Sequence, residues 1–476
     1  MRDHSRFTAH AGCIAACLNV LFATNLWAQT RTAPPADASQ QSSTQITPAI
    51  PRPSGPPAVG LSGQVADWLQ IRGEFRGRLE GFGNGAYKAD NQDGYMLDRF
   101  RFNATMAPSK LAKFVVQVQD ARAFDKKAGG DSNPFRDTLD LRLAYGDLGG
   151  TRHLLRVGRQ ELVFGEQRLL GHLNWANNAR SFDGVRTTLS RKAFKLDAFA
   201  TSVVNIQPEE FDKSGYGNLL VGFYGSSTTA IPKATVEPYV FWRKSEDLTI
   251  ETGGLGNIHQ TTIGTRWVGK LPADFDYGVE MVAQMGSVST DDVSAWAGHW
   301  VAGKTFAATP STPRPFIEFN RASGDSNSTD GVRGTFDQLY PTSHDKLGLV
   351  DQVGWKNINH LRGGLELKPK AQWAVSGSYH SFWLASPTDA LYGANGAAVA
   401  RSVTGTAGTY VGQELDLQAA YTFSPQLQIG GGFGRVLPGE FLKNTTPGES
   451  YGLSYLMVTY VFLGDKPVTP PQGATR

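Results

Sequence analysis

Long segments in which apolar and polar residues alternate constrain the fold of this chain more than any other feature. Between 69 and 80, odd positions carry Leu69, Ile71, Phe75 and Leu79, whereas every even position is polar or charged. The segments 99–106, 138–145 and 414–423 alternate in the same way. Successive side chains of a β-strand point to opposite faces, so each segment predicts a strand with one apolar and one charged face.

The number and spacing of these segments predict a barrel. A soluble sandwich would have to bury every apolar face against a second sheet, whereas a transmembrane barrel places that face against lipid and the charged face in a wet lumen. A soluble propeller or β-helix is the alternative, and it would need a repeat period that we do not find. About eighteen segments start near residues 67, 95, 111, 137, 152, 182, 194, 218, 234, 258, 275, 293, 312, 359, 371, 411, 427 and 451.

The connections between the segments alternate between short and long. The long ones include 81–94, 162–181, 203–217, 322–358, 384–410 and 436–450. Outer-membrane barrels have short periplasmic turns and long extracellular loops. The sequence therefore predicts an all-β fold, a transmembrane antiparallel β-barrel of about eighteen strands of the outer-membrane type.

The two ends of the chain differ from the part between them. Residues 1–28 predict a secretory signal peptide, although the surroundings of Cys17 also resemble a lipoprotein cleavage site. Residues 29–64 form a Pro-rich stretch that predicts a disordered tail, and 464–476 predict a second one. The barrel is expected over 65–463. Both cysteines, Cys13 and Cys17, precede residue 29, so no disulfide or thiolate metal site is expected in the mature chain.

Charge and motifs argue against other classes of protein. The formal net charge is only +3, and the charged residues are spread along the chain, which disfavours a nucleic-acid binder. The sequence contains no Gly-x-Ser-x-Gly elbow and no recognisable nucleophile, base and orienter set, so we do not expect an enzyme. We expect no cofactor.

Two blocks of sequence carry a family resemblance. The first comprises VGRQEL at 157–162, GEQRL at 165–169, NW at 174–175 and RSFDGVR at 180–186. The second comprises SGD at 323–325, FDQLYP at 336–341, His344, Gly348, Asp351 and NINHL at 357–361. These blocks resemble the alginate-export family of outer-membrane barrels. The resemblance implies an eighteen-stranded barrel and a channel for an acidic exopolysaccharide such as alginate.

Arginine exceeds acid on the faces that the alternation turns inward. Guanidinium groups bind carboxylates and phosphates, so these arginines predict a pore wall for anions; alternatively, they pair with nearby acids and only support the wall. If loop 162–181 folds into the lumen, its charged residues join the pore; alternatively, Arg180 pairs with Asp183 to fix the loop. The candidate pore-lining residues are Arg72, Arg76, Arg78, Arg99, Arg101, Arg142, Arg156, Arg159, Arg168, Arg180, Asp183, Arg186 and Arg362.

One polar loop resembles a metal-binding sequence. Asp325, Asn327 and Asp330 space their oxygen atoms somewhat like a calcium loop, but the terminal Glu of that pattern is missing. An ordinary polar outer loop is the simpler interpretation. His344 has no second histidine at ligand spacing.

The function hypothesis follows from these patterns. We expect an outer-membrane channel for anionic substrates, most specifically an acidic exopolysaccharide, with a substrate-specific uptake porin for small organic anions or sugars as the alternative. An outer-membrane enzyme and a purely structural barrel remain less favoured. The expected partners are outer-membrane lipid, the anionic polymer or solute and the barrel-assembly machinery, with no nucleic acid, and the barrel is expected to be a monomer. The patterns leave the direction of transport, gating and the position of loop 162–181 open.

Overall fold

The computed structural model of this chain describes residues 64–249 and 255–462. The predicted signal peptide, Cys17 and the predicted C-terminal tail lie outside these residues. So does the predicted Pro-rich tail, except for its last residue, Gln64. Gln64 begins the short strand β1 (Gln64–Ala66), and the last described strand ends at Phe462. The predicted boundaries of the tails and the barrel stay predictions.

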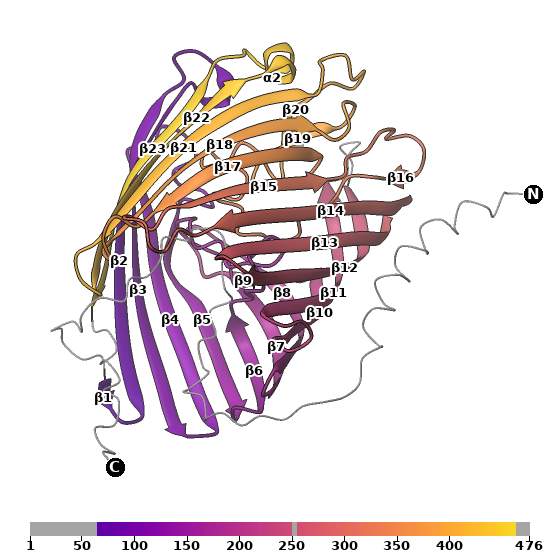
Figure 1. The fold of residues 1–476 in the computed structure, drawn as a ribbon. Helices are drawn as coiled ribbons and strands as arrows, with labels where there is room; N and C mark the ends of the chain where they lie inside the picture. Colours follow the sequence, from indigo (N-terminus) through magenta and orange to yellow (C-terminus); the bar gives the residue numbers. More distant parts are fainter. Residues whose placement is uncertain (1–63, 250–254, 463–476) are drawn as a thin grey trace, which may run out of the picture. The chain divides into compact units, whose positions relative to one another are not determined.

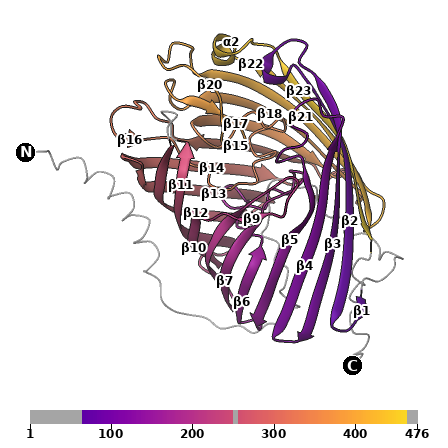
Figure 2. The ribbon, with the colours of Figure 1, turned by 180° about the vertical axis from the view of Figure 1, so that it is seen from behind.

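Eighteen antiparallel strands form a closed barrel, because the last strand pairs with the first from Gly73 opposite Phe462 to Gly83 opposite Gly452. Figures 1 and 2 show the strands following one another around the wall in chain order. The strands are β2 (Leu69–Gly83), β3 (Asp93–Ser109), β4 (Ala112–Phe124), β5 (Asp137–Gly149), β6 (His153–Gln160), β7 (Phe182–Arg191), β8 (Phe194–Asn205), β10 (Asn218–Ser227), β11 (Ala234–Thr249), β12 (Leu255–Leu271), β13 (Phe275–Val288), β14 (Asp291–Lys304), β15 (Arg314–Ala322), β17 (Ile358–Leu367), β18 (Trp373–Leu384), β21 (Tyr410–Thr422), β22 (Leu427–Pro438) and β23 (Tyr451–Phe462).

The predicted strands are confirmed, and every predicted start lies within three residues of the observed one. The additional short elements are β1, β9 (Lys213–Ser214), β16 (Val332–Arg333), β19 (Ala390–Tyr392), β20 (Ala398–Arg401), the 3-10 turn η2 (Gly85–Tyr87) and the helix α2 (Glu440–Thr445). Apart from β1, these lie in the long connections at one end of the barrel, which we call the loop end. The opposite end, with the short connections, is the turn end. Among the described residues, no helix has the length and apolar character that a membrane span requires.

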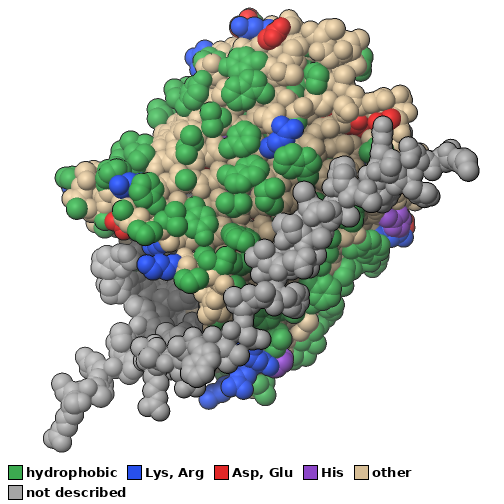
Figure 3. All heavy atoms as spheres, turned by 45° about the vertical axis from the view of Figure 1, so that its right-hand side comes forward, with side chains coloured by type: hydrophobic (Ala, Val, Ile, Leu, Met, Phe, Trp, Pro, Cys, Tyr) green, Lys and Arg blue, Asp and Glu red, His purple; other side chains and the backbone are tan. Residues whose placement is uncertain are grey.

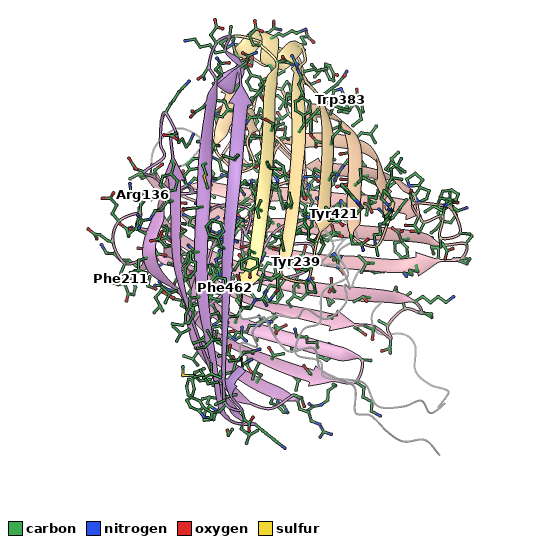
Figure 4. All side chains as sticks on the ribbon, turned by 90° about the vertical axis from the view of Figure 1, so that its left-hand side faces the viewer. Arg136, Phe211, Tyr239, Trp383, Tyr421 and Phe462 are labelled. Carbon is green, nitrogen blue, oxygen red and sulfur yellow. The ribbon has the colours of Figure 1, made fainter. Side chains whose placement is uncertain are left out.

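The predicted alternation separates an apolar exterior from a polar interior. On β2, the outward Leu79 is 54% exposed, whereas its neighbour Arg78 is 3% exposed because it points into the barrel. Figure 3 shows hydrophobic side chains spread over the exterior with few charged groups among them. Aromatic residues mark both ends of the wall: Figure 4 shows Trp383 towards the loop end of β18 and Tyr421 towards the turn end of β21. This surface suits lipid contact.

The buried hydrophobic residues of the described chain lie largely within the lumen. Leu162, Leu170, Phe336, Leu347 and Trp355 are at most 2% exposed, and all belong to connections at the loop end. Such burial requires the connections to fold back between the strands. The lumen is therefore partly filled by loops.

Two paired glycines lie where the connection between β6 and β7 leaves the wall, and each allows a close approach to the next strand. Gly158 on β6 pairs with Gly184 on β7, and both have positive φ, 121° and 152°. A Cβ atom on Gly158 would lie 2.2 Å from the Ala144 carbonyl oxygen, and one on Gly184 would lie 2.3 Å from that of Ala200. Glycine is required at both positions because no other residue fits the backbone and the contact.

A charge on the exterior of the wall tests its assignment to lipid. Leu417 lies mid-strand on the exterior of β21 and is 54% exposed, whereas its neighbour Gln418 faces the lumen. We predict that Leu417→Arg destabilises the barrel in a bilayer by about 2–4 kcal/mol, because the guanidinium would enter the hydrocarbon region. Gln418→Arg is the matched control and should cost much less. Urea unfolding in lipid vesicles measures both, and equal effects would contradict the assignment.

Candidate functional site

Loop L3, residues 161–181 between β6 and β7, crosses the lumen. One part of it contacts β2: Arg76 donates to the backbone oxygen of Asn174 at 2.8 Å. Another part reaches the far side, where Arg168 donates to Glu318 on β15 at 2.8 Å. β2 and β15 lie far apart around the barrel, so a loop that contacts both must span it.

Arginines from one side of the wall hold L3 by its backbone oxygens. Arg99 donates to the Asn174 carbonyl at 3.1 Å, and Arg78 donates to the Trp175 carbonyl at 2.7 Å. Arg101 donates to the side-chain oxygen of Asn174 at 2.7 Å. These groups are buried beneath the loop. We call Arg76, Arg78, Arg99, Arg101 and Arg142 the wall arginines; they lie on β2, β3 and β5.

The carboxylates beside the wall arginines do not match them in number. Arg78 pairs with Glu80 at 2.5 Å, Arg99 with Glu74 at 2.8 Å, and Arg142 with Glu161. Arg76 and Arg101 form no ion pair among the described residues, and neutral oxygens hold both. The cluster itself thus holds five guanidinium groups against three carboxylates, and Asp137, one hydrogen-bonded side chain away from Arg101, lies beside it.

The Glu161 carboxylate belongs to this cluster as an anion. Burial would raise its pKa, but the Arg142 guanidinium, together with His172 and Arg101, outweighs burial and holds the pKa of Glu161 at about 2. Burial lowers the pKa of Arg180, at the other end of L3, to about 10, which still leaves it protonated at neutral pH. Glu161 and Arg180, at the two ends of L3, are therefore both charged at neutral pH.

The opposite side of the lumen carries a mixed cluster. Glu166 of L3 accepts from Arg266 on β12 at 3.1 Å, and Arg266 also pairs with Glu237 on β11 at 2.5 Å. Glu318 accepts from Arg168 and lies 3.4 Å from Arg362 on β17. Acids thus balance bases on this side, unlike beside the wall arginines.

A second inward connection pairs with L3. Loop L7, residues 323–357 between β15 and β17, runs beside L3 so that the Tyr340 amide donates to the Leu169 carbonyl at 2.8 Å. The Thr342 amide donates to the Gln167 carbonyl at 2.9 Å, and Arg180 donates to the Pro341 carbonyl at 2.9 Å. The two loops form one hydrogen-bonded unit within the barrel.

Trp175 at the middle of L3 joins the wall to L7. The Arg78 guanidinium lies 3.8 Å from the centre of the Trp175 ring. The His344 imidazole of L7 stacks on the same ring, with centroids 3.7 Å apart and planes 2° apart. His344 is oriented in turn by a 2.9 Å contact with Asp351. This stack ties L3, L7 and β2 together.

A second group of basic residues lies nearer the turn end. Arg156 pairs with Asp147 at 2.7 Å and Arg186 pairs with Asp197 at 2.8 Å. The side chains of Lys113 and Lys195 are 41% and 39% exposed. We call these residues the basic band: Lys113, Arg156, Arg186 and Lys195, with Asp147 and Asp197 among them. Four cations against two carboxylates make the band positive.

The structure places most of the predicted arginines on the inner wall or in L3, and most of them have partners. Arg159 is an exception, because on β6 it follows the outward alternation of Leu155 and Val157. Arg72 is half-buried on β2, and no described residue forms an ion pair with it. Asp183 binds Arg159 at 2.9 Å, whereas Arg180 binds the Gly171 and Pro341 carbonyls. The expected Arg180–Asp183 pair is therefore wrong, because each group finds a closer partner on another segment.

The metal candidates of the sequence use their oxygens within their own loop. Asp325 Oδ1 accepts from the Asn327 amide at 2.8 Å, Asn327 Oδ1 accepts from the Thr329 amide at 3.2 Å, and Asp330 Oδ1 accepts from the Val332 amide at 2.9 Å. These contacts match an ordinary polar loop.

Sequence reasoning missed the residues that join the two loops. Trp175 stands within the first family-like block and His344 within the second, but their spacing of more than 150 positions gave no sign that they stack. Glu166 and Glu318 were missed as the acids that bind Arg266 and Arg168. Lys113 and Lys195 were missed because only arginines were considered.

Removing the Trp175 ring tests whether the stack holds L3. We predict that Trp175→Ala raises single-channel conductance and current noise in planar bilayers. A cation–π contact contributes about 1–2 kcal/mol when it is desolvated, so its loss should raise the undocked population of L3 about tenfold. Trp383→Ala, an aromatic truncation next to Tyr410 on the wall, is the control and should conduct like the wild type. Unchanged conductance in Trp175→Ala would contradict a holding role.

Comparisons with known proteins agree with this architecture. Among proteins of curated function, none matches the sequence. The solved structure of Pseudomonas aeruginosa OpdQ is similar, with a TM-score of 0.57 and 11% identity over 83% of this chain and 97% of that one. Acinetobacter baumannii OccAB2 has a TM-score of 0.54 and 11% identity over 82% and 98%. P. aeruginosa OccK2 (OpdF) in complex with glucuronate has a TM-score of 0.55 and 11% identity over 85% and 99%.

Those identities establish a shared barrel fold only. The sequence profile described as alginate export matches residues 67–454, which is most of the chain and almost all of the barrel. This match confirms the resemblance carried by the two sequence blocks. The chain therefore belongs to the alginate export family and is a β-barrel channel of the Gram-negative outer membrane.

Proposed function

We propose that this channel exports an acidic polysaccharide, most specifically a uronate polymer such as alginate. The observation that carries the proposal is the pair Arg76 and Arg101, two buried guanidinium groups on the inner wall held by neutral oxygens. A carboxylate partner would cancel the field of such a group, whereas a carbonyl partner leaves the positive charge in place. The membership of the alginate export family supports a uronate polymer as the anion.

The wall arginines have two roles in this proposal. Arg78, Arg99 and Arg142 have carboxylate partners and mainly fix L3. Arg76 and Arg101 fix L3 too, but they also contribute uncompensated charge to the lumen. Some wall arginines thus mainly support the structure, whereas Arg76 and Arg101 both support it and select anions.

The basic band extends the positive surface towards the turn end, which is periplasmic in outer-membrane barrels. The exposed ammonium groups of Lys113 and Lys195 offer weak, repeated contacts rather than one tight site. A polymer with one carboxylate per sugar moves best along such a surface, because no single contact holds it. L3 and L7 narrow the lumen, so the polysaccharide must pass beside these loops or displace them.

Charge selectivity tests the role of Arg76 and Arg101. We predict that the wild-type channel prefers anions in a potassium chloride gradient, and that the Arg76→Gln, Arg101→Gln double variant shifts the reversal potential towards zero. Glutamine keeps a hydrogen-bond donor near the loop oxygens but removes the charge. Arg122→Gln is the control, because Arg122 is exposed and pairs with Asp120. Cation preference in the wild type, or an equal shift in the control, would defeat the proposal.

A second candidate is uptake of small uronates. It is favoured by the similar fold of OccK2, whose structure is a complex with glucuronate. Both candidates place carboxylates beside the same arginines, so they differ in the length of the substrate and not in its charge.

Block of ionic current separates the two candidates. We predict that uronate oligomers of roughly ten sugars interrupt the current at far lower uronate concentration than free glucuronate, because several contacts act together. Raising the salt concentration should weaken the block, since salt screens the exposed charges. Equal block by glucuronate and oligomers would favour small-solute uptake. Block by a neutral glucan of the same length would contradict both candidates.

We also propose that the barrel works as a monomer and that the assembly machinery reads its last strand. Pairing of β23 with β2 closes the barrel within one chain. The strand ends on the aromatic Phe462 (Figure 4). Its ring stacks on that of Phe100 with centroids 5.6 Å apart.

A further inference from the structure

Three carboxylates meet where β5 begins at the loop end. Asp137 and Asp140 belong to β5, and Asp212 lies in the connection that precedes β9. One oxygen of each carboxylate lies within 4.8 Å of one oxygen of each of the others. Figure 4 shows Arg136 and Phe211, the residues before Asp137 and Asp212, on the same side of the molecule. The cluster therefore joins a strand to a loop about 70 residues away.

Each carboxylate gives one oxygen to the protein. Asp137 Oδ2 accepts from the Gln119 amide at 2.9 Å, Asp140 Oδ2 accepts from the Asp212 backbone amide at 2.5 Å, and Asp212 Oδ1 accepts from the Gln207 amide at 2.8 Å. The other oxygens of Asp137 and Asp140 are buried and accept no hydrogen bond, although the two residues are only 2% and 1% exposed. Buried oxygens without donors are costly unless something else satisfies them.

The nearby cation does not satisfy this cluster. Arg159 Nη1 lies 3.7 Å from Asp140 Oδ1, beyond hydrogen-bond distance. The rest of the Arg159 guanidinium is engaged by Asp183, through Nε at 2.9 Å and Nη2 at 3.1 Å. Three carboxylates thus share at most a fraction of one positive charge, and two of their oxygens remain unpaired.

We propose that Asp137, Asp140 and Asp212 bind a divalent cation, calcium, at the extracellular face of the barrel. Calcium takes six to eight oxygen ligands at 2.3–2.6 Å and accepts carboxylates with water in flexible geometry. Carboxylate oxygens within 4.8 Å of one another can converge on one such ion. The ion supplies the positive charge that Arg159 does not.

The site is connected to the channel by one side chain. Gln119 donates both to Asp137 Oδ2 and to the Asn178 carbonyl of L3, each at 2.9 Å, and it accepts from Arg101 at 2.7 Å. Binding at Asp137 therefore fixes the group that orients Arg101 and one end of L3. The bound ion stabilises the loop arrangement independently of which substrate passes.

The experiment uses the mature chain refolded in detergent without lipopolysaccharide, which itself binds divalent cations. Calorimetric titration with calcium chloride after chelator treatment measures binding, and thermal unfolding measures stability. The variants are Asp137→Asn and Asp212→Asn. The matched control is Glu210→Gln, an exposed acid of the same loop that pairs with Lys213. Gel mobility of unheated samples shows whether each barrel is folded.

We expect the wild type and Glu210→Gln to bind about one calcium ion per barrel, with a dissociation constant between about 10⁻⁶ and 10⁻³ M. Calcium should also raise their unfolding temperature. Each Asp variant should bind calcium at least about tenfold more weakly. Asp212 lies on a loop, so Asp212→Asn tests the calcium site even if Asp137→Asn misfolds. Absence of calcium binding in the folded wild type would overturn the proposal, as would equal binding by the wild type and Asp212→Asn. Binding of magnesium but not calcium would overturn the assignment of the ion.

Discussion

Hydrogen bonds from inner-wall arginines to the backbone of L3 determine what the lumen of this barrel contains. A loop that enters an aqueous barrel must exchange its contacts with water for contacts with protein, or its buried backbone groups remain unsatisfied. Arg76, Arg78 and Arg99 make that exchange possible by donating to the carbonyls of Asn174, Trp175 and Ala176. L7 then docks on L3 rather than on the wall alone. The position of both loops follows from these few donors.

The same contacts explain how the wall arginines hold L3 and still carry a net positive charge. An arginine held by a carboxylate, such as Arg99 with Glu74, adds little net charge. An arginine held by carbonyls, such as Arg76, has no carboxylate partner to offset its charge. The wall arginines therefore outnumber their carboxylate partners, whereas the cluster around Glu166 and Glu318 on the opposite side is balanced.

The wall was predictable because its determinants are local. Whether Leu417 faces lipid and Asp416 faces the lumen follows from alternation along a single strand. The sheet closes because an open edge in lipid would leave backbone groups unpaired. The contents of the lumen were not predictable in this way. Arg76 finds its oxygen acceptors about 100 residues away, and Trp175 meets His344 across two loops. Sequence spacing carries no signal for such contacts, so the expected Arg180–Asp183 pair was replaced by pairs with distant partners.

The labelling rate of a cysteine placed in L3 tests the central claim most directly. Residues 29–476 contain no cysteine, so Ala176→Cys in a protein produced as residues 29–476 would provide a single thiol at a position that is 8% exposed. A water-soluble maleimide should react slowly with this thiol while the loop is docked. Adding Arg76→Ala and Arg99→Ala should accelerate the reaction strongly, because the loop loses its donors. Equal rates with and without the two arginines would show that they do not hold L3, and would contradict the account.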